Sequence, residues 1–359
     1  PPPPPPLDNL RRQRQMCIRD RPNTDLNFED GAVTINGTGG GSGATIGSVS
    51  QGVDASGVTM TGTGSGSVTI NGTATGTGSV NQGVALANTA IDLSAGTGSI
   101  TLSGTGSANG LTGNDGVKLA NSDLSSGTDA AIDIDGTGGG TGTGTSNQGV
   151  NLATGSKVVA GGSGTVSIDG TGGNGTVFNR GVYVIGVGSE IKSGTGAITV
   201  NGTAGGTLSL NRGVEIAYTN VATTGAVTVM GTAPTGATGV FNTGVYLLGL
   251  PTTSIGGGTL TITGNGGGGT SLNEGVRVVG GALNGTLALN GTALPGTTGV
   301  WNSGVYLLNA TTGASGSITG TGGGGSGFNH GVYAVGAGIG ITPTGSTTDG
   351  NATSLPVAP

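Results

Sequence analysis

The sequence predicts an all-β protein, a parallel β-helix or β-solenoid, in which each coil of chain stacks on the next. A four-residue phrase, Asn-x-Gly-Val, recurs ten times between Ser50 and Val332 at intervals of 27 to 33 residues. A period in this range is typical of a solenoid. With 84 glycines, 8% charged and 3% aromatic residues, the chain has too little bulk for an ordinary globular core. We therefore expect about ten coils of ~31 residues, each with three short strands.

The repeat phrase begins with asparagine in every copy except the first, where Ser50 takes that place. Stacked coils bring these asparagines into one column, which we expect to form a ladder of side-chain amides that also bonds the adjacent turn. The column consists of Asn81, Asn114, Asn147, Asn179, Asn211, Asn242, Asn273, Asn302 and Asn329. The glycine that follows either adopts a backbone conformation barred to other residues or lets neighbouring coils approach closely.

The first strand of each coil follows this glycine, as in Val182-Tyr183-Val184. Side chains along a strand alternate between two faces, so both valines point one way and the tyrosine the other. In other coils the middle position holds Asp54 or Lys118, which indicates that it faces solvent. The variable x position of the repeat phrase is likewise predicted to be an exposed turn position.

A second strand begins about fifteen residues later, as in Ile100-Thr101-Leu102, and nearly always ends in Gly-Thr. A third inward point is predicted immediately before the anchor asparagine, where bulky residues recur. They are Phe178, Leu210, Phe241, Leu272, Trp301 and Phe328. Between the strands, glycine tracts such as residues 136–144 and 264–269 vary in length, and we expect them to be surface turns.

Three segments are expected along the chain. Residues 11–21 resemble the in-frame translation of a transposase-based sequencing adapter, so residues 1–21 are interpreted as an artefactual leader. Without them, six basic and 15 acidic residues remain, a net charge of −9, and the only cysteine, Cys17, is lost. Residues 22–340 are predicted to form a single β-solenoid domain. Residues 341–359, rich in Thr, Ser and Pro, are expected to be a tail or linker.

The combination of Asn-x-Gly-Val-x-Leu with Ile-x-Leu-x-Gly-Thr-Gly, as at residues 81–86 and 100–106, resembles a known class of repeat. It is similar to the β-helix repeats of filamentous-haemagglutinin-like exoproteins and autotransporter passengers. The resemblance implies a right-handed coil displayed at a bacterial cell surface or secreted, with an adhesive or stalk role. It also implies a host or cell-surface glycan or protein, or a second copy, as partner. No export signal or secretion domain is visible, so a fragment is expected.

Catalytic chemistry is not predicted. The single histidine, His330, occupies the variable x position, which argues against a Ser-His-Asp arrangement. Acids on one face are the remaining enzymatic option, because paired carboxylates cleave polysaccharides. Asp133, Asp135 and Asp169 are expected to point outward together. They form either a solvated strand face, a calcium site or the acids of a polysaccharide-cleaving enzyme. No other cofactor is expected.

Other function classes conflict with the composition. Nucleic-acid binding is not expected with nine net negative charges and no basic stripe. No apolar run is long enough to cross a bilayer. The glycine loops lack the Lys-Ser/Thr and helix that a phosphate-binding loop requires.

An ice-binding solenoid is a further alternative, because threonines recur at the outward position of the second strand. The column contains Thr34, Thr69, Thr101, Thr199, Thr228 and Thr261. Asp133, Ser167 and Ala288 interrupt it, and β-propensity explains the threonines more simply.

Four tyrosines share the outward middle position of the first strand: Tyr183, Tyr246, Tyr306 and Tyr333. Aromatic side chains in such a strip suit sugar rings or a partner surface. Cross-coil packing that stabilises the ladder is the alternative. All four tyrosines lie after residue 170, so the carboxy-terminal half is predicted to be the adhesive half.

Overall fold

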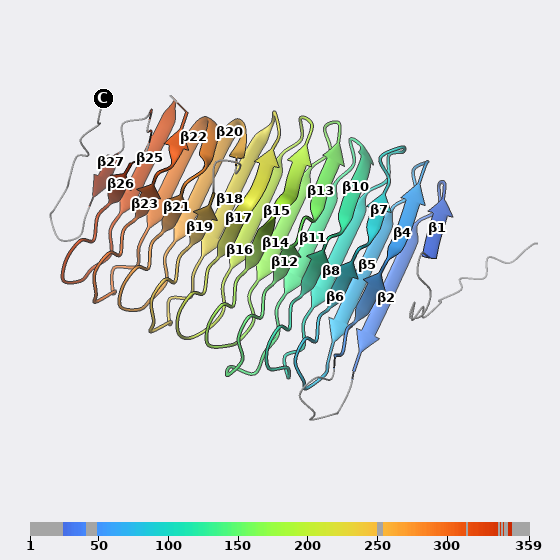
Figure 1. Cartoon of the computed structure of the whole chain (residues 1–359), viewed down its shortest axis with the longest axis horizontal. Helices are drawn as coiled ribbons and strands as arrows, with labels where there is room; N and C mark the ends of the chain where they lie inside the picture. Colours follow the sequence, from blue (N-terminus) through green and yellow to red (C-terminus); the bar gives the residue numbers. More distant parts are fainter. Residues whose placement is uncertain are drawn as a thin grey trace, which may run out of the picture.

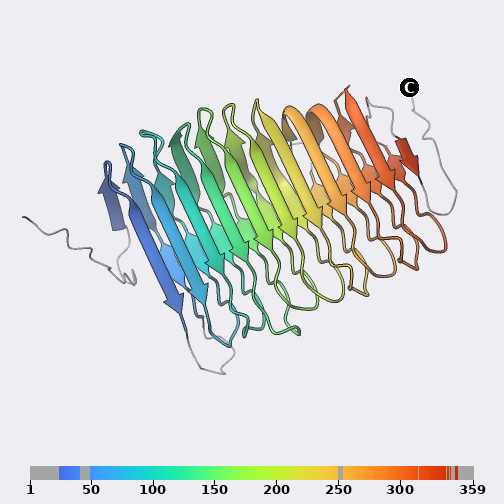
Figure 2. The ribbon, with the colours of Figure 1, turned by 180° about the vertical axis from the view of Figure 1, so that it is seen from behind.

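The computed structural model describes residues 24–40, 49–249, 254–313, 315–336, 338, 340 and 344–346. These residues form a parallel β-solenoid of about nine turns of ~32 residues, with no helix. The predicted fold class is confirmed, and ten copies of the repeat phrase enclose nine turns. Strands of successive coils lie side by side, with β1 and β27 at opposite ends (Figures 1 and 2). The right-handed sense of the coil stays a prediction.

Each coil contributes strands to three parallel sheets, here called faces 1, 2 and 3. Face 1 starts at the valine of the repeat phrase and contains β3 (Val53–Ser56), β6 (Val84–Ala87), β9 (Val117–Ala120), β12 (Val150–Ala153), the beginnings of β15 (Val182–Ser193) and β17 (Val214–Ala222), β19 (Val245–Leu248), β21 (Val276–Val279), β23 (Val305–Leu308) and β26 (Val332–Val335).

Face 2 follows face 1 around a sharp corner. It contains β1 (Thr24–Phe28), β4 (Val58–Gly62), β7 (Ala90–Asp92), β10 (Asp123–Thr128), β13 (Lys157–Gly161), the ends of β15 and β17, the beginnings of β20 (Ser254–Asn265) and β22 (Ala282–Thr292), and β24 (Thr311–Thr312).

Face 3 carries the strands that end in Gly-Thr. It contains β2 (Val33–Gly39), β5 (Val68–Ala74), β8 (Ile100–Thr105), β11 (Ile132–Thr137), β14 (Val166–Thr171), β16 (Ile198–Thr203), β18 (Ala226–Thr232), the ends of β20 and β22, β25 (Gly316–Thr321) and β27 (Thr344–Ser346). The last strand lies in the segment expected to be a tail, so the ladder of face 3 continues past residue 340.

Stacking in register places like residues above like residues. On face 1, Val150 pairs with Val117 in one neighbouring coil and with Val182 in the other. The first and third residues of these strands are buried and the second and fourth are more exposed. This alternation joins the aliphatic side chains into one continuous core along the axis, which a single coil could not bury alone.

The third inward strand does not lie where the sequence analysis placed it. The bulky residues before the anchor asparagine have left-handed backbone, as at Phe178 (φ 60°) and Phe328 (φ 56°), and Phe328 is 60% exposed. The third inward strand is instead on face 2, where Leu124 and Val158 are fully buried. Left-handed backbone at the pre-anchor position turns its side chain out of the core. A large side chain at this position is therefore no sign that the residue is buried.

The glycine of the repeat phrase is explained by close approach of backbones. Gly181 is not among the glycines with positive φ. A Cβ placed on it would lie 2.6 Å from the carbonyl oxygen of Gly213 and 2.6 Å from the carbonyl carbon of Gly202. Faces 1 and 3 therefore converge on two facing columns of glycines, and of the two explanations left open the second holds.

The glycine tracts between faces 3 and 1 are partly buried, which corrects the expectation of surface turns. Gly139, Gly140, Gly266, Gly267 and Gly268 are all buried. Tracts of successive coils lie on one another. The N–H of Gly139 donates to the carbonyl of Asn114 (2.8 Å), and that of Gly140 donates to the carbonyl of Ser107 (2.9 Å). Residues without side chains allow this stacking of backbone on backbone.

Candidate functional site

The anchor asparagines occupy one buried column beneath face 1. Asn179 is 0% exposed, and its Nδ2 donates to Oδ1 of Asn211 (3.2 Å). Its own Oδ1 accepts from both the backbone N–H (3.3 Å) and the Nδ2 (3.2 Å) of Asn147. The same oxygen thus bonds the backbone and the amide of the preceding coil. The column ties the glycine tracts to the sheet and fixes the register on which the outer surface is built.

The x position of the repeat phrase is buried in seven of the ten copies and half-buried in the others, and the prediction of an exposed turn is wrong. Glu274 and Ser303 are 0% exposed, and Thr243 is similarly buried. These side chains pack against those of the middle strand position. For example, Nη1 of Arg277 donates to Oε1 of Glu274 (2.6 Å). The residue at the x position differs from coil to coil, and the side chains that cover it differ as well, so variability here does not indicate exposure.

Four columns of side chains form the exterior of face 1 in its carboxy-terminal half, and we call them the outer layer. They are the pre-anchor residues, the x residues, and the second and fourth residues of each strand, from the coil of β15 to that of β26. The outer layer consists of Phe178, Arg180, Tyr183, Ile185, Leu210, Arg212, Glu215, Ala217, Phe241, Thr243, Tyr246, Leu248, Leu272, Glu274, Arg277, Val279, Trp301, Ser303, Tyr306, Leu308, Phe328, His330, Tyr333 and Val335.

Arginine guanidinium groups stack on aromatic rings along this layer. Arg180 lies 4.1 Å from the ring centroid of Tyr183, and Arg212 lies 4.2 Å from that of Tyr246. Arg277 lies 4.5 Å from the ring of Tyr306. Such contacts contribute about 0.5–2 kcal/mol each, more as they are desolvated. Three of the four predicted tyrosines are therefore packed against an arginine.

Buried carboxylates hold these arginines in place. Glu215 accepts from Nη1 of Arg212 (2.6 Å) and also from Nε of Arg180. Glu274 bonds Arg277 and accepts from Oγ1 of Thr243 (3.2 Å). Burial raises the pKa of Glu274, and Arg277 opposes the shift. Removing either partner would leave a buried charge alone, so these pairs specify the arrangement of the layer.

Aromatic rings continue the layer at its carboxy-terminal end. The rings of Tyr306 and Tyr333 stack with centroids 5.4 Å apart, and those of Trp301 and Phe328 stack at 4.8 Å. His330 stacks on Tyr333 at 5.0 Å. The only histidine thus belongs to an aromatic stack.

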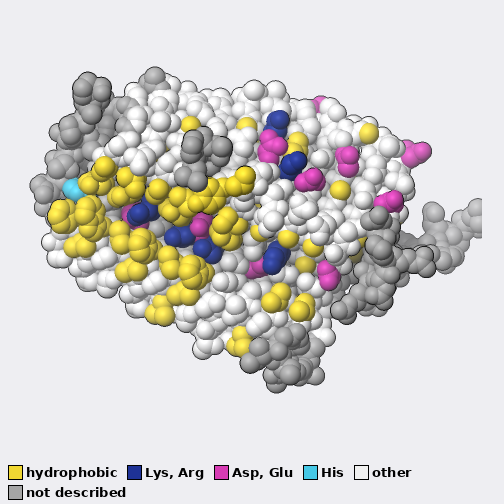
Figure 3. All heavy atoms as spheres, in the orientation of Figure 1, with side chains coloured by type: hydrophobic (Ala, Val, Ile, Leu, Met, Phe, Trp, Pro, Cys, Tyr) yellow, Lys and Arg dark blue, Asp and Glu magenta, His cyan; other side chains and the backbone are white. Residues whose placement is uncertain are grey.

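The outer positions of face 1 change character near residue 170. In earlier coils the second strand position holds Asp54, Ala85, Lys118 and Asn151, and the fourth holds only Ser or Ala. Charge changes as well: residues 24–170 contain 11 acidic and two basic residues, and residues 171–340 contain three acidic and four basic. Figure 3 shows hydrophobic side chains and arginines or lysines gathered over the coils of β19, β21 and β23. The molecule therefore has an acidic half and an apolar half.

The three acids on face 3 lie on two neighbouring strands, β11 and β14. Asp135 pairs with Asp169 across neighbouring strands, and Asp133 pairs with Ser167. The carboxylate of Asp169 accepts from Oγ of Ser167 (2.8 Å) and from Nδ2 of Asn201 (2.7 Å). Among the described residues no group of three or more His, Cys, Asp or Glu is placed to hold a metal ion. Both oxygens of Asp169 thus bond neighbours on the sheet, and the calcium interpretation stays a prediction.

Asp135 lies beside Asp169 in a hollow of about 220 Å³ on this face. Burial raises the pKa of Asp135, and the nearby charges of Asp169 and Asp133 raise it further. The hollow is open and is lined by the Gly-Thr ends of β11, β14 and β16. The three acids therefore lie on an open strand surface. Hydrogen bonds hold the carboxylate of Asp169, and burial and neighbouring charges raise the pKa of Asp135.

Asp115 is another buried acid, in the x position of the third copy. Its Oδ1 accepts from the backbone N–H of Gln148 (3.0 Å) and its Oδ2 from Nδ2 of Asn151 (3.0 Å). Burial raises the pKa of Asp115, while the hydrogen bonds and the charge of Lys118 oppose the shift. A carboxyl whose pKa is raised on folding stabilises the fold only while protonated. Its contribution is lost as pH rises above the ordinary value of 3.8 toward the folded one.

Asp115→Asn is accordingly expected to raise stability at neutral pH, with a melting temperature about 2–4 °C higher. The new amide carries no charge to bury. Oδ1 of Asn151, which has no hydrogen-bond partner, accepts from it once the Asn151 amide rotates. Melting curves across the carboxyl titration range provide the measurement. A variant that melts lower, or that keeps the wild-type decline with pH, would contradict this account.

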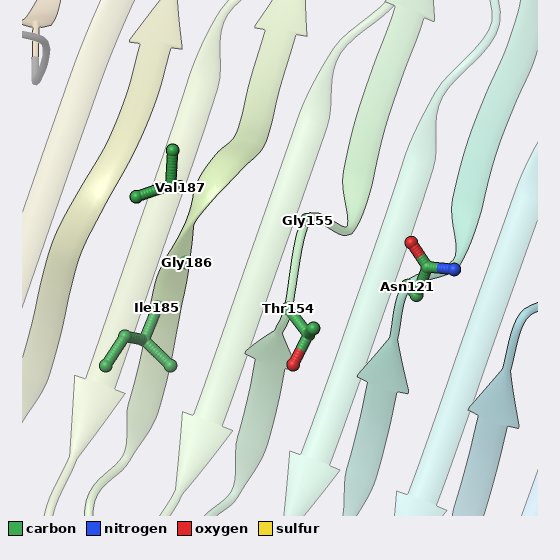
Figure 4. Close-up of a pocket in the computed structure, with 6 residues that line it drawn as sticks. All are labelled: Asn121, Thr154, Gly155, Ile185, Gly186 and Val187. Carbon is green, nitrogen blue, oxygen red and sulfur yellow. The ribbon is translucent and has the colours of Figure 1, made fainter.

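The corner between faces 1 and 2 carries an open hollow of about 550 Å³. Figure 4 shows its lining, in which Asn121 and Thr154 lie on one side and Ile185 and Val187 on the other. The corner of β15 is longer than its neighbours, because the register shifts between Ile185 and Ser189. Val187 consequently projects from the corner and is 83% exposed. The apolar surface of the carboxy-terminal half thus extends to this edge.

The tyrosines were predictable from the sequence, but the arginine–glutamate pairs beside them were not predicted. The i and i+3 spacing of Glu274 with Arg277, and of Arg212 with Glu215, was the available signal. No helix among the described residues is long and apolar enough to span a membrane. Neither a family model, nor a curated protein, nor a solved structure matches this chain.

Proposed function

We propose that this chain is an adhesive β-solenoid of a secreted or surface-displayed bacterial exoprotein, which binds its partner through the outer layer. The repeat phrase and the Gly-Thr strand ends, which resemble those of filamentous-haemagglutinin-like exoproteins and autotransporter passengers, support the bacterial surface setting. The outer layer supports adhesion rather than a passive stalk.

The observation that carries the proposal is the contrast between the two halves of face 1. Both halves stack the same asparagine and glycine columns, so aromatic side chains are not needed to build a coil. The early coils expose Asp54, Lys118 and Asn151 at the position where later coils place Tyr183 and Tyr246. Soluble monomers rarely expose contiguous apolar patches larger than a few hundred Å², and larger patches mark interaction sites. Binding explains why such surface is confined to one half.

A polysaccharide-cleaving enzyme is less well supported. Its two carboxyl groups would have to be Asp135 and Asp169, which lie on an open strand surface. Glycosidases use one acid for proton transfer and another as nucleophile or base, and both lone-pair sets must reach substrate. Here Asp169 is bonded through both oxygens to Ser167 and Asn201.

Replacement of the four outer tyrosines by serine tests the adhesive proposal. In Tyr183→Ser, Tyr246→Ser, Tyr306→Ser and Tyr333→Ser combined, we expect loss of roughly 90% of binding to cells or glycan arrays, since aromatic anchors dominate interface energies. The measurement is binding of the labelled chain, with circular dichroism to confirm folding. The matched control replaces Thr69, Thr101, Thr199 and Thr228 on face 3 by serine. Folded tyrosine variants that bind as well as wild type would refute the proposal.

A further inference from the structure

We infer that the outer layer binds the outer layer of a second copy of this chain, in a two-fold symmetric dimer with antiparallel solenoid axes. This inference rests on the proposed function, because it names the partner of the same surface. The dimer axis runs parallel to β19, through the coil that contains Tyr246. Such an axis reverses the order of the coils and keeps each position along the strand, so every column of the outer layer faces itself.

The second strand position is self-complementary under this operation. In coil order it holds Tyr183, Glu215, Tyr246, Arg277 and Tyr306. Reversal about Tyr246 places that tyrosine against its own copy, and places Glu215 against Arg277 of the second copy. Tyr183 then faces Tyr306. An isologous interface requires this kind of complementarity, because residue i contacts j while j contacts i.

The x position obeys the same symmetry. Thr243 is the central residue, and the flanking residues are Arg212 in the coil before it and Glu274 in the coil after it. Thr243 and Glu274 are 1% and 0% exposed, so this column lies beneath the contact and keeps its charges within the chain. Each of these charges already has a partner within its own chain, so docking leaves no buried charge alone.

In the pre-anchor column, side chains of similar size face each other across the two-fold axis. The column reads Phe178, Leu210, Phe241, Leu272 and Trp301, so leucine faces leucine and a ring faces a ring. These side chains belong to the same surface as the tyrosines, since Arg277 lies 5.8 Å from the ring centroid of Phe241 and 4.5 Å from that of Tyr306.

The fourth strand position supplies the aliphatic part. Its central residue is Leu248, with Ala217 and Val279 on either side and then Ile185 and Leu308. Reversal places the small Ala217 against the larger Val279, and Ile185 against Leu308. Over the five coils from β15 to β23, all four columns share one centre, the coil of β19, and no column places like charges against each other. The sixth coil, that of β26, faces the coil of β12 in the second copy.

The size of the surface suits a dimer. The contact spans seven coils, the six of the outer layer and that of β12. At ~4.8 Å per coil and a width of roughly 20 Å across the strand, this is a face of about 34 by 20 Å. Two such faces bury about 1,360 Å² in total, within the range of stable specific interfaces. A glycan stacked on the tyrosines fits less well, because Arg180, Arg212 and Arg277 already lie over the rings of Tyr183, Tyr246 and Tyr306.

Sedimentation equilibrium of the purified full chain is the first test, and a dimer is expected. Tyr246→Lys places two lysines against each other at the two-fold axis and should convert the dimer to monomer. The matched control is Ala85→Lys, in the same strand position of β6 and far from the axis, which should remain dimeric. A wild-type monomer at the highest concentration reached overturns the inference, as does a Tyr246→Lys dimer of unchanged strength.

Cross-linking tests the register. Sheets pack about 10 Å apart, too far for a disulfide, whose Cα atoms lie within about 7 Å, so a thiol cross-linker that spans this gap is used, in a Cys17→Ser background. Tyr246→Cys alone should cross-link to itself. Tyr183→Cys alone and Tyr306→Cys alone should not, but their mixture should give a cross-linked pair. Self-cross-linking of Tyr183→Cys alone would instead indicate axes that run in the same direction and would overturn the antiparallel arrangement.

Adhesion measured in parallel separates the two proposals. If the chain is a monomer and the four-tyrosine variant still loses binding to cells or glycans, the dimer fails and the adhesive function stands. If the chain dimerises as described and binds neither cells nor glycans beyond copies of itself, adhesion is homotypic. If neither dimerisation nor tyrosine-dependent binding occurs, both proposals fail.

Discussion

Gly181→Ala is expected to destabilise the solenoid by about 3 kcal/mol or more, the upper range for overpacking in a closely packed interior. The added Cβ would lie 2.6 Å from the carbonyl oxygen of Gly213 and 2.6 Å from the carbonyl carbon of Gly202. Both atoms are backbone, and both lie in strands or turns that pair with further coils. No side-chain rotation relieves the overlap, so faces 1 and 3 must separate locally. The measurement is the urea midpoint of unfolding, together with hydrogen exchange of the neighbouring coils.

Gly236→Ala is the matched control for this substitution. A Cβ on Gly236 meets no atom within 4 Å, and its φ is not in the left-handed region. We expect no loss of stability and a gain of up to about 1 kcal/mol, because alanine restricts the unfolded chain more than glycine does. If both variants unfolded at the same urea concentration, close approach could not be the reason for glycine in the repeat phrase.

Repetition explains why the fold was predictable. Every coil repeats the same local pattern, so an inward valine identified in one copy is identified in all, and the register follows from the spacing of the phrase. Val182 and Val184, predicted to face the core, are 0% and 1% exposed. The facing glycines were also visible as two recurrent positions, Asn-x-Gly and Gly-Thr. The structure was needed to show that their backbones touch.

The errors arose where side-chain identity and backbone conformation conflict. Phe178 and Trp301 look like core residues, yet left-handed backbone turns them outward. Glu274 looks like a surface residue, yet neighbouring side chains bury it completely. Both errors concern the same layer, because a bulky pre-anchor residue is one of the neighbours that cover the x position. Periodicity gives which positions share a column, but not which columns cover one another.

The candidate surface was therefore only half predictable. A common position for Tyr183, Tyr246, Tyr306 and Tyr333 followed from the repeat. The stacking of Arg180 and Arg212 on them did not, because these two arginines come from a different column, the x position of the phrase. Cation–π contacts such as that of Arg212 with Tyr246 cross from one coil to the next. Such contacts depend on the distance between columns, which is set by the turn at the anchor asparagine.

Asn179→Ala is expected to cost about 3–5 kcal/mol, because each buried group left without a partner costs about 1–3 kcal/mol. The Asn179 side chain takes part in four hydrogen bonds, two accepted from Asn147 and one donated to each of Val177 and Asn211. Alanine would leave the backbone N–H and the amide of Asn147 short of an acceptor at a position with no access to water. Hydrogen bonds in neighbouring coils should then open together, since each coil is held mainly by the next.

Asn71→Ala is the control for Asn179→Ala, because it removes a stacked amide that is exposed rather than buried. Nδ2 of Asn71 donates to Oδ1 of Asn36 (2.9 Å) on exposed face 3, where water replaces the lost partner. We expect a change within about 0.5 kcal/mol for this surface substitution. Urea unfolding monitored by circular dichroism measures both variants, and hydrogen exchange locates the opening. Equal losses would mean that stacking alone, rather than buried bonding to the backbone, makes the anchor column stabilising. A loss confined to Asn179→Ala, with rapid exchange near Asn147, would place this stability in the two hydrogen bonds that the buried Asn179 oxygen accepts.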